Sequence, residues 1–305
     1  MLYDLIIIGG GPAGMAAGIY GARQKLKVLL ITKEFGGQVV KKAMAIENYP
    51  GIETATGEEL MAKFKNHLKH FAVETVEDEI LKIEKQGDGF LIAGKSGAKW
   101  QSKTVLIASG ADPRLLKVPG ENKFLGKGVG YCVTCDGPLF KDKIVAVVGG
   151  GNSAFEAALF LAGFAKKVYL LEPKEVSADK INQDRVIKNS IIENLPLTVA
   201  REIKGDDFVR ALTIENLATS QKQDLAVEGV FIEIGYSPAV IFVENLVEFS
   251  EKGEIKIDQQ TGATITAGLF AAGDATDTKV KQVVVAAAGG AKAALAASQY
   301  IRETI

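Results

Sequence analysis

Cysteine, histidine and tryptophan are scarce in this chain of 305 residues, which has two cysteines, two histidines and one tryptophan. A single pair of cysteines cannot form the several disulfides that stabilise small secreted scaffolds. The histidines, His67 and His70, lie in a basic segment that we expect to be an exposed helix, and they are spaced more tightly than zinc-binding histidine pairs usually are. We therefore predict no metal site. A zinc site shared by the histidines and the cysteines is the weaker alternative.

An excess of charge and a long apolar run are also lacking. The 36 Lys and Arg residues nearly balance the 37 Asp and Glu residues, and no basic run of five occurs, so we predict no nucleic-acid partner. The segment 283–297 is apolar but contains Gly289, Gly290 and Lys292, and it is shorter than the roughly 18 to 20 apolar residues of a membrane span. The first residues do not resemble a secretory signal. We expect a cytoplasmic protein without membrane association.

The two cysteines that are present, Cys132 and Cys135, are separated by two residues. This spacing lets both sulfur atoms form one short disulfide, and a helix N-terminus at this place would lower a thiol pKa. Asp136 follows directly and is a candidate to carry the proton that thiol chemistry gains or loses. Its alternative role is that of a helix-capping acid. We interpret the pair as a redox-active dithiol.

A glycine-rich loop follows the apolar run 5–8 and precedes the helix-compatible segment 15–25, and an expected strand, 27–31, comes next. This order is that of a dinucleotide-binding βαβ unit. In such a loop Gly9 permits the tight turn, Gly11 lets the backbone approach a pyrophosphate, and Gly14 lets the helix pack closely.

The same pattern recurs at 144–171, where an apolar strand leads into the loop from Gly149 to Ala154, a helix and a second strand. One such fingerprint is weak in a glycine-rich chain, but two in the required context predict two dinucleotide sites. The second strand ends at Glu172, 21 residues after Gly151, where an acid binds a ribose 2′-hydroxyl and repels a 2′-phosphate. Glu172 therefore favours NADH over NADPH, unless it is a solvent-facing strand end. Glu34, in the first unit, is a less persuasive ribose-binding acid.

The order of these units predicts the domain organisation. Further apolar strands are expected at 104–108, 230–234 and 268–272, and a long helix at 283–301. We predict an α/β fold of two Rossmann-like nucleotide-binding domains, the second inserted in the first. The first domain comprises residues 1–109 and 240–305, and the second comprises residues 110–239 with the dithiol. The first connection, at 111–114, is expected to be an irregular crossover, the second is expected to follow the strand in 230–238, and both are expected to act as hinges.

These motifs resemble the low-molecular-weight thioredoxin reductases. They are still more similar to the flavoprotein subunit of alkyl hydroperoxide reductase without its N-terminal thioredoxin-like extension. The resemblance covers nearly the whole chain, and its motifs occur in the same order. They lie at 9–14, 35–38, 46–51, 131–140, 149–157, 270–276 and 281–282.

The resemblance implies FAD in the first domain and a nicotinamide nucleotide in the second. The residues implied for FAD are Gly9, Gly11, Pro12, Ala13, Gly14, Thr32, Glu34, Gly36, Gly37, Gln38, Asn48, Gly110, Gly273, Asp274, Lys281, Gln282 and Val283. The residues implied for the nicotinamide nucleotide are Gly149, Gly151, Asn152, Ser153, Ala154 and Glu172. The chain departs from typical thioredoxin reductases because no arginine follows Glu172 before Arg185. This difference also favours NADH.

The resemblance further implies a thioredoxin-disulfide reductase-like flavoenzyme. Electrons would pass from NAD(P)H through FAD and the Cys132–Cys135 disulfide, with Asp136 as the acid-base group, to a thioredoxin-like or glutaredoxin-like protein. It also implies a homodimer and rotation of the inserted domain. Alternatives are another donor such as ferredoxin, a peroxidase partner, or a non-enzymatic zinc or nucleotide-binding module.

Overall fold

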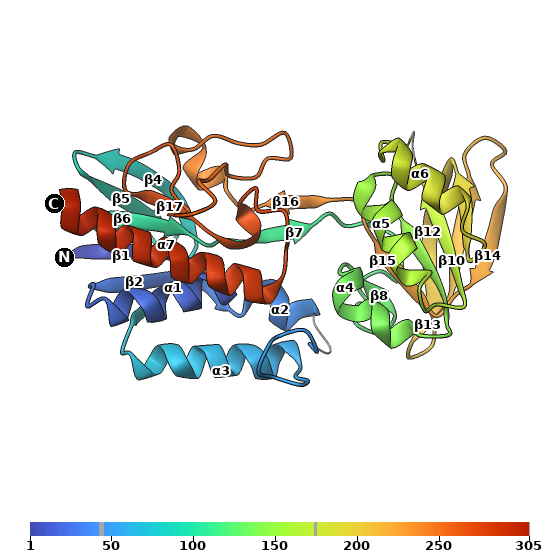
Figure 1. The fold of residues 1–305 in the computed structure, drawn as a ribbon, viewed down its shortest axis with the longest axis horizontal. Helices are drawn as coiled ribbons and strands as arrows, with labels where there is room; N and C mark the ends of the chain where they lie inside the picture. The colour runs from blue at the N-terminus through green and yellow to red at the C-terminus, as the bar shows by residue number, and fades with distance from the viewer. Residues whose placement is uncertain (43–45, 174–175, 305) are drawn as a thin grey trace. The chain divides into compact units, whose positions relative to one another are not determined.

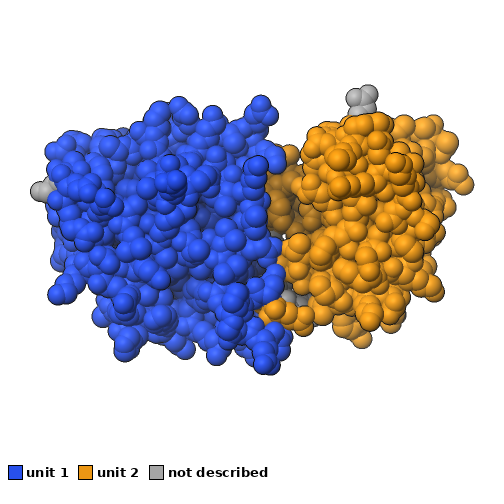
Figure 2. Space-filling model, viewed as in Figure 1, with its two compact units in different colours: residues 1–41, 48–112, 237–305 blue, residues 42–47, 113–236 orange. Residues whose placement is uncertain are grey.

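The computed structural model describes residues 1–42, 46–173 and 176–304. The chain divides into two compact units, coloured separately in Figure 2. Unit 1 contains Met1–Lys41, Asn48–Asp112 and Ser237–Ile305, and unit 2 contains Lys42–Glu47 and Pro113–Tyr236.

Unit 1 is built on a seven-stranded sheet. Its strands are, in spatial order, β3 (Glu74–Glu77), β2 (Val28–Phe35), β1 (Leu2–Gly10), β6 (Lys99–Ile107), β5 (Gly89–Gly94) and β4 (Ile80–Gln86), and β17 (Leu269–Ala271) also pairs with β6. The strands β3, β2, β1, β6 and β17 are parallel to one another, whereas β5 is antiparallel to both β6 and β4. The run 5–8 lies in the central strand and is buried, as expected for a parallel strand covered on both faces.

The helices of unit 1 bring the two ends of the chain together. Figure 1 shows α7 (Val283–Thr304) running beside α1 (Pro12–Arg23), against which α3 (Gly57–His70) also packs. The close approach of α7 requires Gly290, because a Cβ atom there would lie 1.9 Å from the carbonyl oxygen of Ala13. A short helix, α2 (Gly37–Lys42), follows β2, and a 3-10 helix, η3 (Gly273–Ala275), follows β17. The predicted C-terminal helix is confirmed, and His67 and His70 are exposed on α3 beside Phe71.

Unit 2 contains a five-stranded parallel sheet. Its strands are, in spatial order, β11 (Ile192–Pro196), β10 (Lys167–Glu172), β9 (Ile144–Val148), β15 (Gly229–Ile232) and β8 (Val129–Gly130). One face packs against α5 (Asn152–Leu161) and α6 (Lys180–Ile187). The other face packs against an antiparallel sheet of β12 (Thr198–Gly205), β13 (Val209–Asn216) and β14 (Lys222–Ala226). Alternate side chains of β15 enter the two cores, with Phe231 on the helical side and Val230 on the other.

Two of the unit boundaries fall inside short strands, β7 (Ala111–Pro113) and β16 (Tyr236–Pro238), which pair with each other. The prediction of irregular backbone at 111–114 was wrong, because residues 111–113 form a strand. Each segment is extended, and the other segment supplies hydrogen-bond partners that the local sequence does not reveal. Close to this ribbon, the amide of Arg114 donates to the carbonyl of Gly235 (2.9 Å), and the amide of Ala239 donates to that of Gly110 (3.2 Å).

Candidate functional site

The first glycine loop leaves one side of its backbone open. β1 ends at Gly10, and α1 begins after Gly11, which has no side chain to cap the helix. A Cβ atom at Gly14 would lie 1.8 Å from the carbonyl oxygen of Gly9, so Gly14 is required for the protein's own packing. No heavy atom of another part of the chain lies within 4 Å of a Cβ atom placed on Gly11. This open position at a helix N-terminus is where a pyrophosphate can approach backbone amides.

The segment after β2 holds this loop in place. Gly10 donates its amide hydrogen to Thr32 Oγ1 (2.9 Å), and the Thr32 hydroxyl donates to the carbonyl of Glu34 (2.6 Å). Gly36 donates its amide hydrogen to the carbonyl of Gly10 (2.8 Å). The Thr32 side chain, predicted to lie near FAD, is therefore buried and used to shape the loop.

Gln38 has one satisfied and one unsatisfied end. Its amide nitrogen donates to Asp112, whereas its Oε1 atom is buried without a hydrogen-bond partner among the described residues. A buried acceptor without a donor is costly, so Oε1 is a place where a ligand donor would be favourable.

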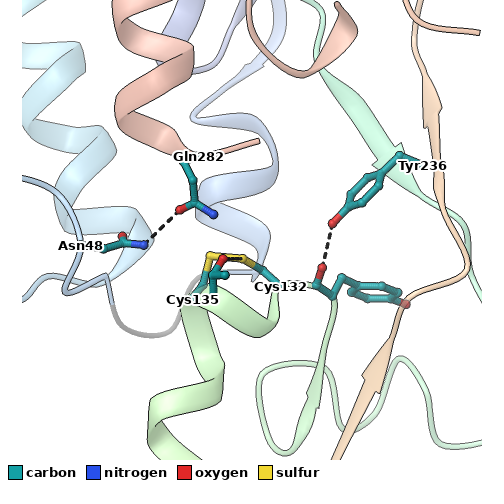
Figure 3. Close-up of a disulfide and its surroundings, with 7 residues drawn as sticks. Asn48, Cys132, Cys135, Tyr236 and Gln282 are labelled. Atoms are coloured by element: carbon teal, nitrogen blue, oxygen red, sulfur yellow. Dashed lines mark hydrogen bonds between the residues drawn. A yellow bond between two sulfur atoms is a disulfide. The ribbon is translucent and has the colours of Figure 1, made fainter. Parts of the chain in front are cut away.

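The C-terminal segment also reaches the first loop. A Cβ atom on Gly273, whose φ is +75°, would lie 3.1 Å from that of Ala13. Asn48 Nδ2 donates to Gln282 Oε1 (3.0 Å), as Figure 3 shows. Lys281 Nζ donates to the carbonyl of Asp274 (3.2 Å) and pairs with Glu254 (2.9 Å).

Asp274 itself is largely enclosed. Burial raises the pKa of its carboxyl group, and the positive charge of Lys281 opposes this change. With Gly273 it lines a cavity of about 170 Å³ together with residues of α7 and of 257–262. The structure therefore brings the predicted segments 9–14, 32–38 and 273–274 close to one another in unit 1, where glycine backbone, an uncapped helix and a buried acceptor fit a dinucleotide.

The second glycine loop has the same form in unit 2. Gly151 precedes α5 without a side-chain cap, and a Cβ atom placed on it would meet only Ser177 Oγ, at 3.6 Å. The Asn152 side chain is engaged within the protein, since Nδ2 donates to Asp179 (3.0 Å) and Oδ1 accepts from the Asp179 amide (2.7 Å). The open side of this loop is therefore backbone, as in the first loop.

Glu172 is buried at the end of β10, with 3% of its surface exposed, so the alternative of a solvent-facing strand end is wrong. Burial raises the pKa of its carboxyl group, and the neighbouring Asn194 side chain opposes this change. The Oε1 atom has no hydrogen-bond partner among the described residues. Asn194 was missed by the sequence analysis because its position beside Glu172 depends on the pairing of β10 with β11.

The cysteines form a disulfide, which confirms the predicted pairing. Cys132 precedes the short helix α4 (Val133–Asp136), and its carbonyl accepts the amide hydrogens of Cys135 (3.2 Å) and Asp136 (3.0 Å). Cys132 Sγ lies 3.4 Å from the hydroxyl of Thr134. Figure 3 shows the bond in the first turn of this helix.

Asp136 lies in an unusual environment for a carboxylate. Its Oδ1 atom is buried and has no hydrogen-bond partner in the described part of the chain, and burial raises its pKa to about 7. Asp136 makes no side-chain capping hydrogen bond, so the alternative of a capping acid is wrong. It lies against Gly130, where a Cβ atom would be only 2.9 Å from Oδ2. A group with this pKa can hold or release a proton near neutral pH.

A cluster that the sequence analysis missed anchors the residue before Cys132. The Tyr131 hydroxyl donates to Glu121 (2.6 Å), and Tyr236 donates its hydroxyl hydrogen to the carbonyl of Tyr131 (2.7 Å), the bond drawn in Figure 3. Glu121, which is 3% exposed, also accepts the amide hydrogens of Leu116 (2.9 Å) and Lys117 (2.7 Å). Tyr131 is thus attached to the segments that follow β7 and begin β16. Only its position beside Cys132 hinted at this role.

Comparison with protein families matches residues 3–290 to the pyridine nucleotide-disulphide oxidoreductases. The chain belongs to this family. Among solved structures, thioredoxin reductase from Streptococcus pyogenes has a TM-score of 0.93 and 39% identity, with 99% of both chains covered. Thioredoxin reductase from Giardia duodenalis has a TM-score of 0.94 and 32% identity, again with 99% of both chains covered.

Two longer proteins are similar to this oxidoreductase. The F subunit of alkyl hydroperoxide reductase from Staphylococcus epidermidis is 39% identical over 301 residues, which are 98% of this chain and 59% of that protein. A Bacillus subtilis protein named NADH dehydrogenase is 39% identical over 300 residues, which are 98% of this chain and 58% of that protein. The chain therefore spans less than two thirds of the length of these relatives.

These comparisons confirm the predicted family, the α/β fold of two nucleotide-binding domains and the enzyme class. The chain is an oxidoreductase of the thioredoxin reductase type, and its family implies FAD, a pyridine nucleotide and a redox-active disulfide. Among the described residues, no group of three or more His, Cys, Asp and Glu side chains is arranged to hold a metal ion. Within the same residues, no helix combines the length and apolar character needed to cross a membrane.

Proposed function

We propose that this flavoenzyme passes electrons from NADH, through FAD and the Cys132–Cys135 disulfide, to a thioredoxin-like or glutaredoxin-like protein. The observation that carries the proposal is the disulfide beside a buried carboxyl group, Asp136, whose pKa is about 7. A structural disulfide has no need of such a group, whereas reduction of a disulfide to two thiols takes up two electrons and two protons.

Residues 1–109 and 240–305 are proposed to hold FAD. The open backbone at Gly11 and the buried acceptor Gln38 Oε1 support this assignment. The first leaves room for a ligand at the glycine loop, and the second lacks a hydrogen-bond donor that a ligand could supply. Gly273 and Asp274 approach the same loop. When bound, FAD supplies a two-electron relay, and the chain contributes orientation and charge.

Residues 110–239 are proposed to bind NADH. The loop at Gly151 is open, and Glu172 has a buried oxygen that lacks a donor in the described residues. A ribose 2′-hydroxyl would supply that donor, whereas a 2′-phosphate would meet a buried carboxylate. The printed name of the Bacillus subtilis relative, NADH dehydrogenase, agrees with this choice.

The dithiol passes its electrons on by exchange. After reduction, one thiolate attacks the disulfide of the partner protein and a mixed disulfide forms. The second thiolate then attacks the mixed disulfide, so the partner leaves reduced and the Cys132–Cys135 bond forms again. Asp136 can hold a proton for this cycle because its pKa lies near neutral pH.

The remaining proposals concern the setting of the reaction. We propose a cytoplasmic homodimer in which residues 110–239 rotate about the connections at β7 and β16. The name of the Staphylococcus epidermidis relative supports a peroxidase partner as the second candidate. The complete second loop argues against a ferredoxin-type donor.

The test is anaerobic stopped-flow reduction of the bound flavin by NADH and by NADPH. We expect NADH to be at least about tenfold more efficient, which corresponds to about 1.4 kcal/mol. Glu172→Gln should reduce the ratio of the efficiency with NADH to the efficiency with NADPH. Glu193→Gln, which changes an exposed glutamate on the adjacent strand β11, should leave this ratio unchanged. Faster reduction by NADPH would disprove the role of Glu172. Reduction by neither nucleotide would favour another donor.

A further inference from the structure

Three neighbouring parallel strands of unit 2 end at the same edge of the sheet. β15 lies between β8 and β9, with Val230 opposite Val129 and Ile232 opposite Val148. Beyond this edge β8 leads to the disulfide, β9 leads to the second glycine loop, and β15 leads to Glu233. Glu233 therefore follows the strand that separates the disulfide from the loop.

Glu233 contacts both of these neighbours. Its amide donates to the carbonyl of Val148 (2.9 Å), and its own carbonyl oxygen lies 2.3 Å from where a Cβ atom on Gly149 would be. On the other side, β15 pairs with β8, the strand that leads to Cys132, and the backbone of Val133, the residue that follows Cys132, lies close enough to the Glu233 carboxyl group to lower its pKa. One carboxylate is thus held against the turn that carries the disulfide.

We propose that Glu233 is a second titratable carboxylate of the dithiol site, and that its charge sets the reactivity of the reduced Cys132 and Cys135 thiols. The inference rests on the proposed function in one respect, namely that the dithiol is reduced and reoxidised during turnover. Glu233 acts on the sulfur atoms through its charge and through the Val133 amide, so it is a positioning residue.

The electrostatic effect has a definite sign. Burial raises the pKa of Glu233 to about 7, and the hydrogen bond from Val133 opposes this change. Charged groups on neighbouring segments are Asp136, whose Oδ2 would lie 2.9 Å from a Cβ atom on Gly130 of β8, and Arg114, whose side chain lies near Gly235, two residues after Glu233. Above neutral pH an ionised Glu233 disfavours a thiolate nearby, and a thiolate likewise disfavours an ionised Glu233. Removing the charge should therefore lower the thiol pKa.

The test uses the reduced protein and the rate of alkylation by iodoacetamide from about pH 5.5 to about 9.5, a range that includes the pKa of an ordinary thiol, about 8.5. Since the chain has two cysteines, both in this site, every alkylated residue reports on it. Glu233→Gln keeps an oxygen that can accept from Val133 but removes the charge. We expect its thiol pKa to fall by roughly half to one unit and alkylation at pH 7 to be about three to ten times faster.

Two variants control this measurement. Glu228→Gln removes a charge at the opposite end of β15, where Glu228 accepts a hydrogen bond from the Ile144 amide (3.3 Å), and it should behave as wild type. Glu233→Asp keeps the charge and should retain the wild-type thiol pKa even if Glu233→Gln folds poorly. Identical alkylation profiles for the wild type, Glu233→Gln and Glu228→Gln would overturn the inference. Failure of NADH to reduce the flavin of the wild-type protein would instead disprove the proposed function.

Discussion

The two glycine loops both begin with three glycines, yet the protein surrounds them differently. The loop of unit 1 is held by its own unit, with Thr32 and Gly36 bonded to Gly10 and with Gly273 close to Ala13. The loop of unit 2 adjoins Glu233, which also contacts the disulfide turn. The glycine-rich sequence therefore specifies the local backbone of each loop. The strands around the loop determine whether it only binds a dinucleotide or also adjoins a residue of the reacting disulfide site.

The substitution expected to distinguish the functions of the two units most strongly is Cys135→Ser. A single thiol cannot close the intramolecular disulfide, so turnover of a disulfide substrate should fall by on the order of 10³ or more. Flavin content, measured by absorbance of the purified protein, should stay at the wild-type level because the loop of unit 1 is untouched. Loss of flavin from Cys135→Ser would mean that the two units are not independent in this respect.

Asp136→Asn should make unit 2 more stable while it slows disulfide reduction. The pKa of Asp136 is raised from 3.8 to about 7, so the folded wild type loses stability as the pH rises from about 4 to 7 and then levels off. The full difference between these two pKa values corresponds to about 4 kcal/mol of the free energy of unfolding. We expect most of it at pH 8, since the neutral amide that replaces the carboxyl group has no charge to bury and resembles the protonated carboxyl group in size.

Urea unfolding at several pH values measures this effect. The variant and the wild type should have equal free energies of unfolding below about pH 3, where the wild-type carboxyl group is protonated in both states. A difference that is the same at every pH would show that charge is not its cause. No comparable pH dependence is expected from changes in the loop of unit 1.

The smallest effects distinguish the ligands of the two loops. Gly11→Ala places a methyl group in open space, and Gly151→Ala places one at ordinary contact distance from Ser177 Oγ (3.6 Å), so each variant should fold with a free energy of unfolding within about 1 kcal/mol of wild type. Gly11→Ala should weaken FAD binding about tenfold, and Gly151→Ala should raise the KM for NADH about tenfold. Flavin release and steady-state kinetics measure the two outcomes. The reverse pattern would exchange the ligands proposed for the loops.

Local sequence was sufficient for much of the fold and of the site. The apolar runs 5–8 and 144–148, each followed by a glycine loop and a helix, identified both βαβ units because every signal lies within about thirty residues. The dithiol and Asp136 were found for the same reason, since they are adjacent in the chain.

These local signals could not predict contacts between strands that are far apart in the sequence. Asn194 lies beside Glu172 through the pairing of β10 with β11, and Glu233 reaches the disulfide turn through the pairing of β15 with β8. The ribbon of β7 and β16 joins segments more than a hundred residues apart. In each case the deciding information is register in a sheet, which an isolated segment of sequence does not contain.

The anchor of Tyr131 determines which substitutions this enzyme can tolerate. Glu121 accepts hydrogen bonds from three donors, two of them backbone amides, so any apolar replacement leaves buried donors unpaired, at about 1 to 3 kcal/mol for each. The Tyr236 hydroxyl donates in this cluster to the carbonyl of Tyr131, which precedes Cys132. In a collection of active variants Glu121 should therefore be nearly invariant, and Tyr236 should be substituted more often.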